Sequence, residues 1–141
     1  MQTTTKWSKA LAFDAEASQH TVRIDTTVEG GGLDSGMGPK EMLLCALSAC
    51  SGMDVVSILD KMKVPYALLE IVASAEQTEE HPKAFKEIFL TYKTDAPESY
   101  SDKVKRAVEL SQDRYCGIAA MLRKHCAIHH TIEHVVQLSG Q

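Results

Sequence analysis

The apolar segment that follows Pro39 constrains the fold of this chain more than any other stretch of its sequence. Proline fits the first turn of a helix, and Glu41 favours the positive end of the helix dipole. We therefore predict one long helix over residues 39–62, with Pro65 just beyond its end. Its apolar residues surround most of the helix axis. Such a helix is buried on nearly all sides, either by its own chain or by a partner.

The same segment is not expected to span a membrane, because Ser48, Ser51, Asp54 and Ser57 interrupt it. The N-terminal residues lack the apolar core and cleavage site of a signal peptide, so we expect a cytoplasmic protein. The net charge of −4 comes from both signs mixed along the chain, without a basic run. This pattern argues against nucleic acid as the main partner. A membrane is not expected as a partner either, because the apolar segment is interrupted as described above.

The rest of the sequence predicts an α+β fold in a single domain over residues 1–141. Alternating and β-branched residues predict strands, polar and glycine-rich stretches predict turns, and apolar spacing predicts helices. Strands are expected over residues 4–13, 20–28, 66–77, 84–94 and 127–138, with turn-like residues 15–19 between the first two, and helices over 99–114 and 118–123. This order favours antiparallel hairpins around the long helix over βαβ alternation.

The chain has four cysteines, and in a cytoplasmic protein these are free, redox-active or metal-bound more often than they form structural disulfides. Cys45 and Cys50 lie on the predicted long helix, five residues apart. At about 100° per residue their side chains point roughly 140° apart, so they are not expected to bond to each other. Core packing is the expected role of Cys45.

Cys50 and Cys116 occupy surroundings that suit thiol chemistry. Small residues flank Cys50, so another sulfur or a substrate can approach it closely. Cys116 and Gly117 begin a predicted helix, whose N-terminal amides favour a thiolate. Two such cysteines can form a peroxidatic and resolving pair, in which one becomes a sulfenic acid and the other condenses with it. The alternative is that both are inert, buried small side chains.

A second cluster of chemical interest covers residues 125–134, which include four histidines and Cys126. A helix would align Cys126, His130 and His134 as a zinc-binding face. The β-branched residues favour a strand, with histidines on its outer face, and the spacing matches no zinc motif. Phosphate-binding glycine loops and hydrolase motifs do not occur, so neither nucleotide binding nor serine hydrolysis is supported.

The sequence resembles the OsmC/Ohr family of osmotically inducible and organic-hydroperoxide-resistance proteins, and most of all its YhfA-like branch. The residues that carry the resemblance are His20-Thr21-Val22-Arg23-Ile24-Asp25, Gly38-Pro39-Lys40-Glu41-Met42-Leu43-Leu44, Ala49-Cys50, and Tyr115-Cys116 followed by Ala119, Ala120, Met121 and Leu122. The order of elements agrees over essentially the whole chain. The resemblance implies an intertwined homodimer with the long helices packed back to back.

Active members of the family are thiol peroxidases without haem, flavin or metal. By resemblance, Cys50 would be the peroxidatic cysteine and Cys116 the resolving one. The substrate would be an organic hydroperoxide in an apolar pocket at the dimer interface. The reductant would be an external dithiol, which is of lipoyl type in the best-known members. An arginine and a glutamate activate the reactive cysteine in the family. Here Arg23 and Glu41 are the candidates, with Arg114 as a second arginine.

We therefore expect a cytoplasmic antioxidant oxidoreductase of the oxidative stress response, acting through Cys50 and Cys116. The leading alternative is a non-catalytic protein of the same fold, which binds a small apolar or thiol-reactive ligand between subunits. A metal-binding protein that uses Cys126 and nearby histidines is a more distant alternative.

Overall fold

A computed structural model describes residues 1–136 of the protein, and residues 137–141 lie outside the described part. The chain forms two compact units, residues 1–44 and residues 45 onward. The boundary between them falls within the long helix α1 (Pro39–Lys61). The bounds of α1 confirm the helix predicted over residues 39–62 to within one residue. The mixed α+β class is also as predicted.

The first unit contains an antiparallel sheet of three strands in the order β1-β2-β3. These strands are β1 (Thr4–Lys9), β2 (Ala12–Ala17) and β3 (His20–Ile24). The predicted strand over residues 4–13 is wrong, because the backbone of Ala10 reverses direction with a φ of 50°. The turn predicted over residues 15–19 is confined to Ser18 and Gln19, whose φ values of 48° and 67° suit a two-residue hairpin turn.

A loop after β3 is organised by the carboxylate of Asp25, which is only 2% exposed. Asp25 Oδ1 accepts from the backbone N–H of Thr26, and Oδ2 accepts from the N–H groups of Leu33 and Ser35 and from the Ser35 hydroxyl at 2.6 Å. These bonds, led by that hydroxyl, lower the pKa of Asp25 to about 2 from its ordinary value of 3.8. One buried side chain therefore fixes most of the glycine-rich loop.

Helix α1 begins with a capping interaction made by its own residues. The Glu41 carboxylate accepts from the Gly38 N–H at 2.7 Å, and the Met42 N–H donates to the Gly38 carbonyl at 2.9 Å. A glutamate three residues after the N-cap residue, here Gly38, is well placed for this bond. Within the chain, α1 buries a single stripe spaced by four residues: Leu47, Ser51, Val55 and Leu59. Burial of each large apolar member contributes about 2 kcal/mol.

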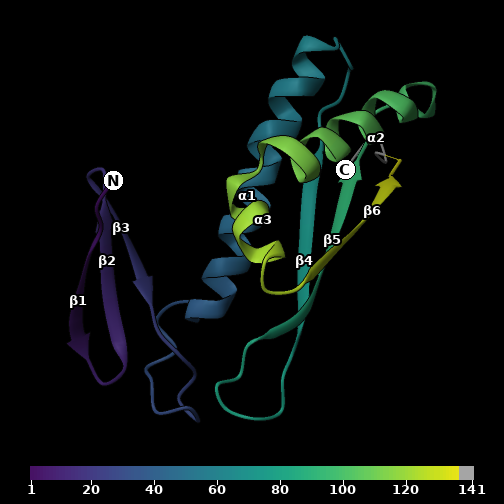
Figure 1. Ribbon diagram of the computed structural model, residues 1–141. Helices are drawn as coiled ribbons and strands as arrows, with labels where there is room; N and C mark the ends of the chain where they lie inside the picture. Colours follow the sequence, from purple (N-terminus) through teal and green to yellow (C-terminus); the bar gives the residue numbers. More distant parts are fainter. Residues whose placement is uncertain (137–141) are drawn as a thin grey trace. The chain divides into compact units, whose positions relative to one another are not determined.

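The second unit contains another sheet, in the order β4-β5-β6. In Figure 1, α1 runs roughly along the direction of the strands, whereas α2 lies at a steep angle to them, near their upper ends. The strands are β4 (Leu69–Gln77), β5 (Phe85–Thr94) and β6 (Ala127–His134). β4 and β5 pair antiparallel as expected, but β5 and β6 pair in parallel. Parallel pairing is possible because the helical segment between β5 and β6 is long enough to return the chain to the starting end of the sheet.

That returning segment is a nearly continuous helical path with one wide turn. It consists of a 3-10 turn (Glu98–Tyr100), α2 (Ser101–Leu110), a π-helical turn (Ser111–Tyr115) and α3 (Gly117–Arg123). The Cys116 N–H donates to the Ser111 carbonyl at 2.8 Å, a bond across five residues instead of four. The predicted apolar face of α2 is confirmed, since Val104, Ala107 and Val108 are buried.

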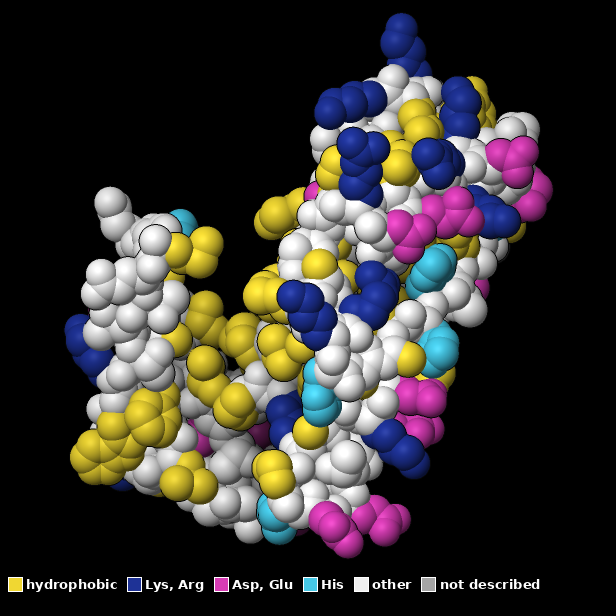
Figure 2. Space-filling view, viewed as in Figure 1, with side chains coloured by type: hydrophobic (Ala, Val, Ile, Leu, Met, Phe, Trp, Pro, Cys, Tyr) yellow, Lys and Arg dark blue, Asp and Glu magenta, His cyan; other side chains and the backbone are white. Residues whose placement is uncertain are grey.

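Apolar side chains remain at the surface of each unit, and they are yellow among the charged groups in Figure 2. On α1, Met53 is 73% exposed and Val56 is 39% exposed. By length and composition alone α1 could cross a membrane, but the buried core helix of a soluble protein passes the same test. The stripe through Ser51 packs against β5 and the π-helical turn, as expected of a core helix.

Candidate thiol site

The second unit brings Cys50 and Cys116 together. Cys50 is half-buried on α1, and Cys116 is 3% exposed between the π-helical turn and α3. Their side chains share a hydrogen bond, although the two residues lie far apart in the sequence. Both cysteines are free thiols in this structure. The proximity of Cys50 and Cys116 therefore agrees with the prediction that they form a redox pair.

Cys116 caps the start of α3, as its position before Gly117 suggested. Its sulfur accepts from the Ala119 N–H at 3.3 Å. However, the expected thiolate at this helix start is wrong. Burial raises the pKa of Cys116 to about 11, and the contact with Cys50 and the charge of Asp54 act in the same direction, against the lowering by Ala119. At neutral pH, Cys116 is therefore a protonated thiol that neighbours Cys50.

Next to the two thiols lies a connected set of polar side chains, which we call the polar chain. Its members are Arg123, Gln112, Tyr92, Ser51, Ser111 and Asp54. Tyr92, on β5, is fully buried, and its hydroxyl lies 2.5 Å from Ser51 Oγ and 2.7 Å from Gln112 Nε2. Burial raises the pKa of Tyr92, and the nearby charges of Cys116 and Asp54 contribute. The polar chain is thus close enough to the thiol pair for the charge of Cys116 to affect the pKa of Tyr92.

Sequence reasoning missed Tyr92, Gln112 and Arg123. Tyr92 belongs to a β-rich strand, and a tyrosine there looks like an ordinary core residue. Arg123 looks like a favourable charge at the end of a short helix. The available signal was polarity at buried positions: Ser51 lies on the apolar helix, and Ser111 continues the apolar face of α2.

The predicted activating residues have other partners. Arg23, on β3, binds both oxygens of Asp14, with Nε 2.7 Å from Oδ1 and Nη2 3.1 Å from Oδ2, and this bond raises its pKa. Glu41 caps α1 as described above. Arg114 lies over the ring of Tyr115, at 5.5 Å from its centroid. The activating roles of Arg23 and Glu41 stay predictions.

The zinc-binding helix considered for residues 125–134 does not form, because residues 127–134 are the strand β6. His129 stacks on Phe89, and His130 meets the ring of Tyr92 edge-on. His134 Nδ1 lies 2.9 Å from the Ala96 carbonyl oxygen. Among the described residues, no group of three His, Cys, Asp or Glu side chains is arranged to hold a metal ion.

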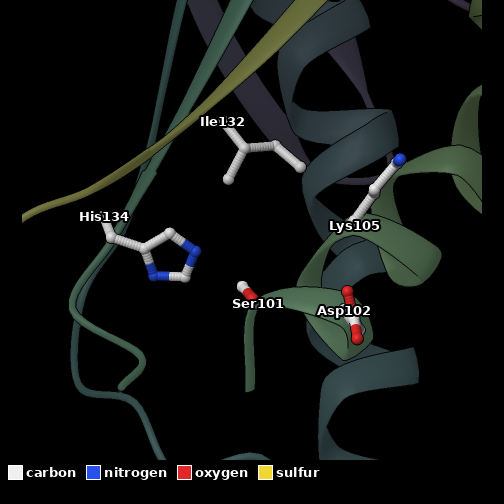
Figure 3. Close-up of a pocket in the computed structure, with 5 residues that line it drawn as sticks. All are labelled: Ser101, Asp102, Lys105, Ile132 and His134. Carbon is white, nitrogen blue, oxygen red and sulfur yellow. The ribbon is translucent and has the colours of Figure 1, made fainter. Parts of the chain in front are cut away.

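A shallow hollow of about 210 Å³ lies between α2 and β6. Figure 3 shows Ile132 and His134 projecting from the strand toward Ser101, Asp102 and Lys105 of the helix. Its lining contains neither Cys50 nor Cys116, so this hollow is separate from the thiol pair.

Comparison with known proteins identifies the family of this chain. The family model described as "OsmC-like protein" matches residues 30–138. Protein YhfA of Escherichia coli (strain K12) is 38% identical over 134 residues, which cover 94% of this chain and 97% of that protein.

Two solved structures extend the comparison. The crystal structure of a hypothetical protein from Aquifex aeolicus VF5 is 25% identical, with a TM-score of 0.78 over 95% of this chain and 96% of that one. An organic hydroperoxide resistance protein OsmC from Legionella pneumophila shares the fold at 10% identity, with a TM-score of 0.70 over 94% and 95% of the two chains. With a family model that covers most of its length and a relative this similar, the chain belongs to the OsmC-like protein family.

Proposed function

We propose that this protein is a thiol peroxidase that reduces organic hydroperoxides through Cys50 and Cys116. The observation that carries the proposal is the hydrogen bond between these two thiols, one half-buried and one buried. The family supplies the substrate class, because related structures are named as organic hydroperoxide resistance proteins. The expected cellular compartment is the cytoplasm, where both thiols stay reduced between turnovers.

The accessibilities of the two thiols support the proposed order of reaction. Cys50 is the more exposed of the two, so in the proposal it meets the hydroperoxide first. The Cys50 thiolate attacks the terminal oxygen of the peroxide and breaks the O–O bond. The sulfur takes up OH and becomes a sulfenic acid, and the departing alkoxide takes a proton to give an alcohol.

Cys116 then resolves the sulfenic acid. Its sulfur attacks the Cys50 sulfur, an S–S bond forms, and the hydroxide that leaves takes the Cys116 proton as water. Because its raised pKa keeps Cys116 protonated at neutral pH, this step requires that the proton pass from the Cys116 sulfur to the leaving hydroxide as the S–S bond forms. An external dithiol of lipoyl type reduces the disulfide and is itself oxidised, which restores both thiols.

A second copy of the chain is part of the proposal. Within one chain α1 buries only one stripe, while Met53 and Val56 remain exposed on its other faces. Apolar side chains grouped in this way on a helix favour an interface. A homodimer that covers them would also enclose the apolar hydroperoxide beside Cys50.

The proposal is tested with reduced protein and one equivalent of cumene hydroperoxide. We expect the count of free thiols to fall from four to two and mass spectrometry to find Cys50 linked to Cys116. With excess dithiol, Cys50→Ser should abolish hydroperoxide consumption. Cys45→Ser removes an exposed thiol from the same helix and should leave the rate unchanged. If four thiols remain and the hydroperoxide persists, the ligand-binding alternative is favoured.

A further inference from the structure

The polar chain can satisfy its hydrogen bonds in only one direction. A guanidinium only donates, so the Arg123 bonds to the carbonyl and Oε1 of Gln112, at 2.7 and 2.9 Å, fix which atom of that amide is oxygen. The two hydrogens on Gln112 Nε2 then go to the Tyr92 hydroxyl at 2.7 Å and to Ser51 Oγ at 3.2 Å. The order of donors is therefore set from this end.

The other end sets the same order. A carboxylate accepts, so the Ser111 hydroxyl donates to Asp54 Oδ2 at 3.0 Å. Ser111 Oγ, 2.8 Å from Ser51 Oγ, must then accept the Ser51 hydrogen. Ser51 in turn accepts the hydrogen of Tyr92. Every donor leads from the cation of Arg123 toward the carboxylate of Asp54, and hydrogen bonds connected in this way strengthen one another.

Two members of the polar chain, Ser51 and Ser111, are connected directly to the backbone of a reactive cysteine. Ser51 directly follows Cys50 in α1, and the carbonyl of Ser111 accepts the N–H of Cys116 at 2.8 Å. Tyr92 supplies the fixed point between them from the centre of the sheet, where its exposed fraction is 0%. The polar chain therefore connects α1, β5 and the π-helical turn at the place where the two sulfurs meet.

We infer that Tyr92, Gln112 and Arg123 are positioning residues that hold Cys50 and Cys116 in the geometry of disulfide formation. The inference rests on the proposed function for its biological purpose but concerns the pair itself. A disulfide forms only within a narrow range of separation and dihedral angle. Rigid anchoring of both backbones raises the effective concentration of one sulfur at the other.

The test measures the equilibrium between dithiol and disulfide in buffers of reduced and oxidised glutathione, without hydroperoxide. Tyr92→Phe removes one hydroxyl and leaves a Gln112 hydrogen without its acceptor. We expect the equilibrium constant for the Cys50–Cys116 disulfide to fall about tenfold, which makes the reduction potential about 30 mV less negative. Gln112→Met should have a similar effect and serves if Tyr92→Phe does not fold.

The matched control is Tyr66→Phe, which also removes a hydrogen-bonded hydroxyl, here one 3.3 Å from Asp60. It should leave the equilibrium constant within about twofold of wild type, because distant sites act independently. In a hydroperoxide assay, trapping with dimedone should show that Tyr92→Phe forms the Cys50 sulfenic acid at the wild-type rate but closes the disulfide more slowly. A general loss of stability would not slow closure of the disulfide while leaving formation of the sulfenic acid at its wild-type rate.

Equal equilibrium constants for wild type, Tyr92→Phe and Gln112→Met would overturn the inference, as would an equal shift in Tyr66→Phe. Failure of the wild-type disulfide to form in glutathione buffer would overturn it as well. A wild-type protein that forms the disulfide there but consumes no hydroperoxide would instead refute the proposed function and leave the positioning role intact.

Discussion

Two buried polar networks of this protein differ in how far apart their members lie in the sequence. Asp25 collects its donors from residues one to ten positions away, all in one loop. The bonds of Tyr92 reach residues 41 and 20 positions away, and the bond between Ser51 and Ser111 joins residues 60 apart. The local network fixes the shape of one loop, whereas the long-range network fixes three elements relative to one another.

The sequence separation of its members indicates whether a polar network can bear on the chemistry of the protein. A carboxylate that binds its own loop stabilises that segment wherever the reactive groups lie. A network that joins distant elements can set the separation of two residues carried by them, here Cys50 and Cys116. The two networks should therefore respond differently to substitution, one mainly in stability and the other in both stability and disulfide equilibrium.

The largest loss of stability is expected from Asp25→Asn. An amide keeps the shape, but it turns a donor toward the N–H groups of Leu33 and Ser35 and accepts with one oxygen only. Circular dichroism should show a lower melting temperature than for any other variant proposed here, while the Cys50–Cys116 equilibrium in glutathione changes less than about twofold.

The control for this variant is Asp34→Asn, an exposed residue of the same loop whose positive φ of 52° asparagine tolerates. It should melt like wild type. Acid provides a further test of the Asp25 network. The contribution of the Asp25 carboxylate to the stability of the folded state is present above its ordinary pKa of 3.8 and is lost as the pH falls through about 2. An Asp25→Asn protein as stable as wild type would remove the distinction between the networks.

Ser51→Ala should lower the free energy of unfolding by an intermediate amount. It should also greatly lower the equilibrium constant for the Cys50–Cys116 disulfide. It leaves the Tyr92 hydrogen without its acceptor and Ser111 without a donor, in a region where Ser51 is 0% exposed. Unmade buried bonds of this kind cost about 1–3 kcal/mol, measurable by urea denaturation of the reduced protein. Ser57→Ala, on the exposed side of α1, is the control and should cost less than about 0.5 kcal/mol.

The smallest effect at neutral pH concerns the proton of Cys116. Its pKa is raised from an ordinary value of 9.0 to about 11, so the folded state holds this proton more tightly than the unfolded state does. The resulting stability is present below pH 9.0 and is lost as the pH rises through about 11. Urea unfolding of the reduced protein across this range should show a shallower decline for Cys116→Ser than for Cys45→Ser. Parallel declines would contradict the raised pKa.

The sequence predicted those features that depend on local pattern. Pro39 and Glu41 located the start of α1, and alternation located most of β4 and β5. The pairing of Cys50 with Cys116 followed from their surroundings together with the family resemblance.

Other features depend on contacts between distant residues and could not be predicted in this way. The parallel direction of β6 beside β5 leaves no trace in the alternation of either strand. Burial of Cys116 outweighs the favourable amide of Ala119, and the degree of burial is a property of the folded chain. The partners of Tyr92 lie on other elements, so its sequence neighbours do not indicate that it is more than a core residue.

The wide turn at Ser111–Tyr115 makes the site depend on chain length as well as on residue type. One extra residue per turn rotates everything after it by about 100° relative to a regular helix. Asp113 is exposed within this turn, so substitution of its side chain should cost little stability. Deletion of the whole residue, however, would rotate Cys116 away from the sulfur of Cys50. Relatives that keep both cysteines and lose one residue here would thus retain the reactive groups without their alignment.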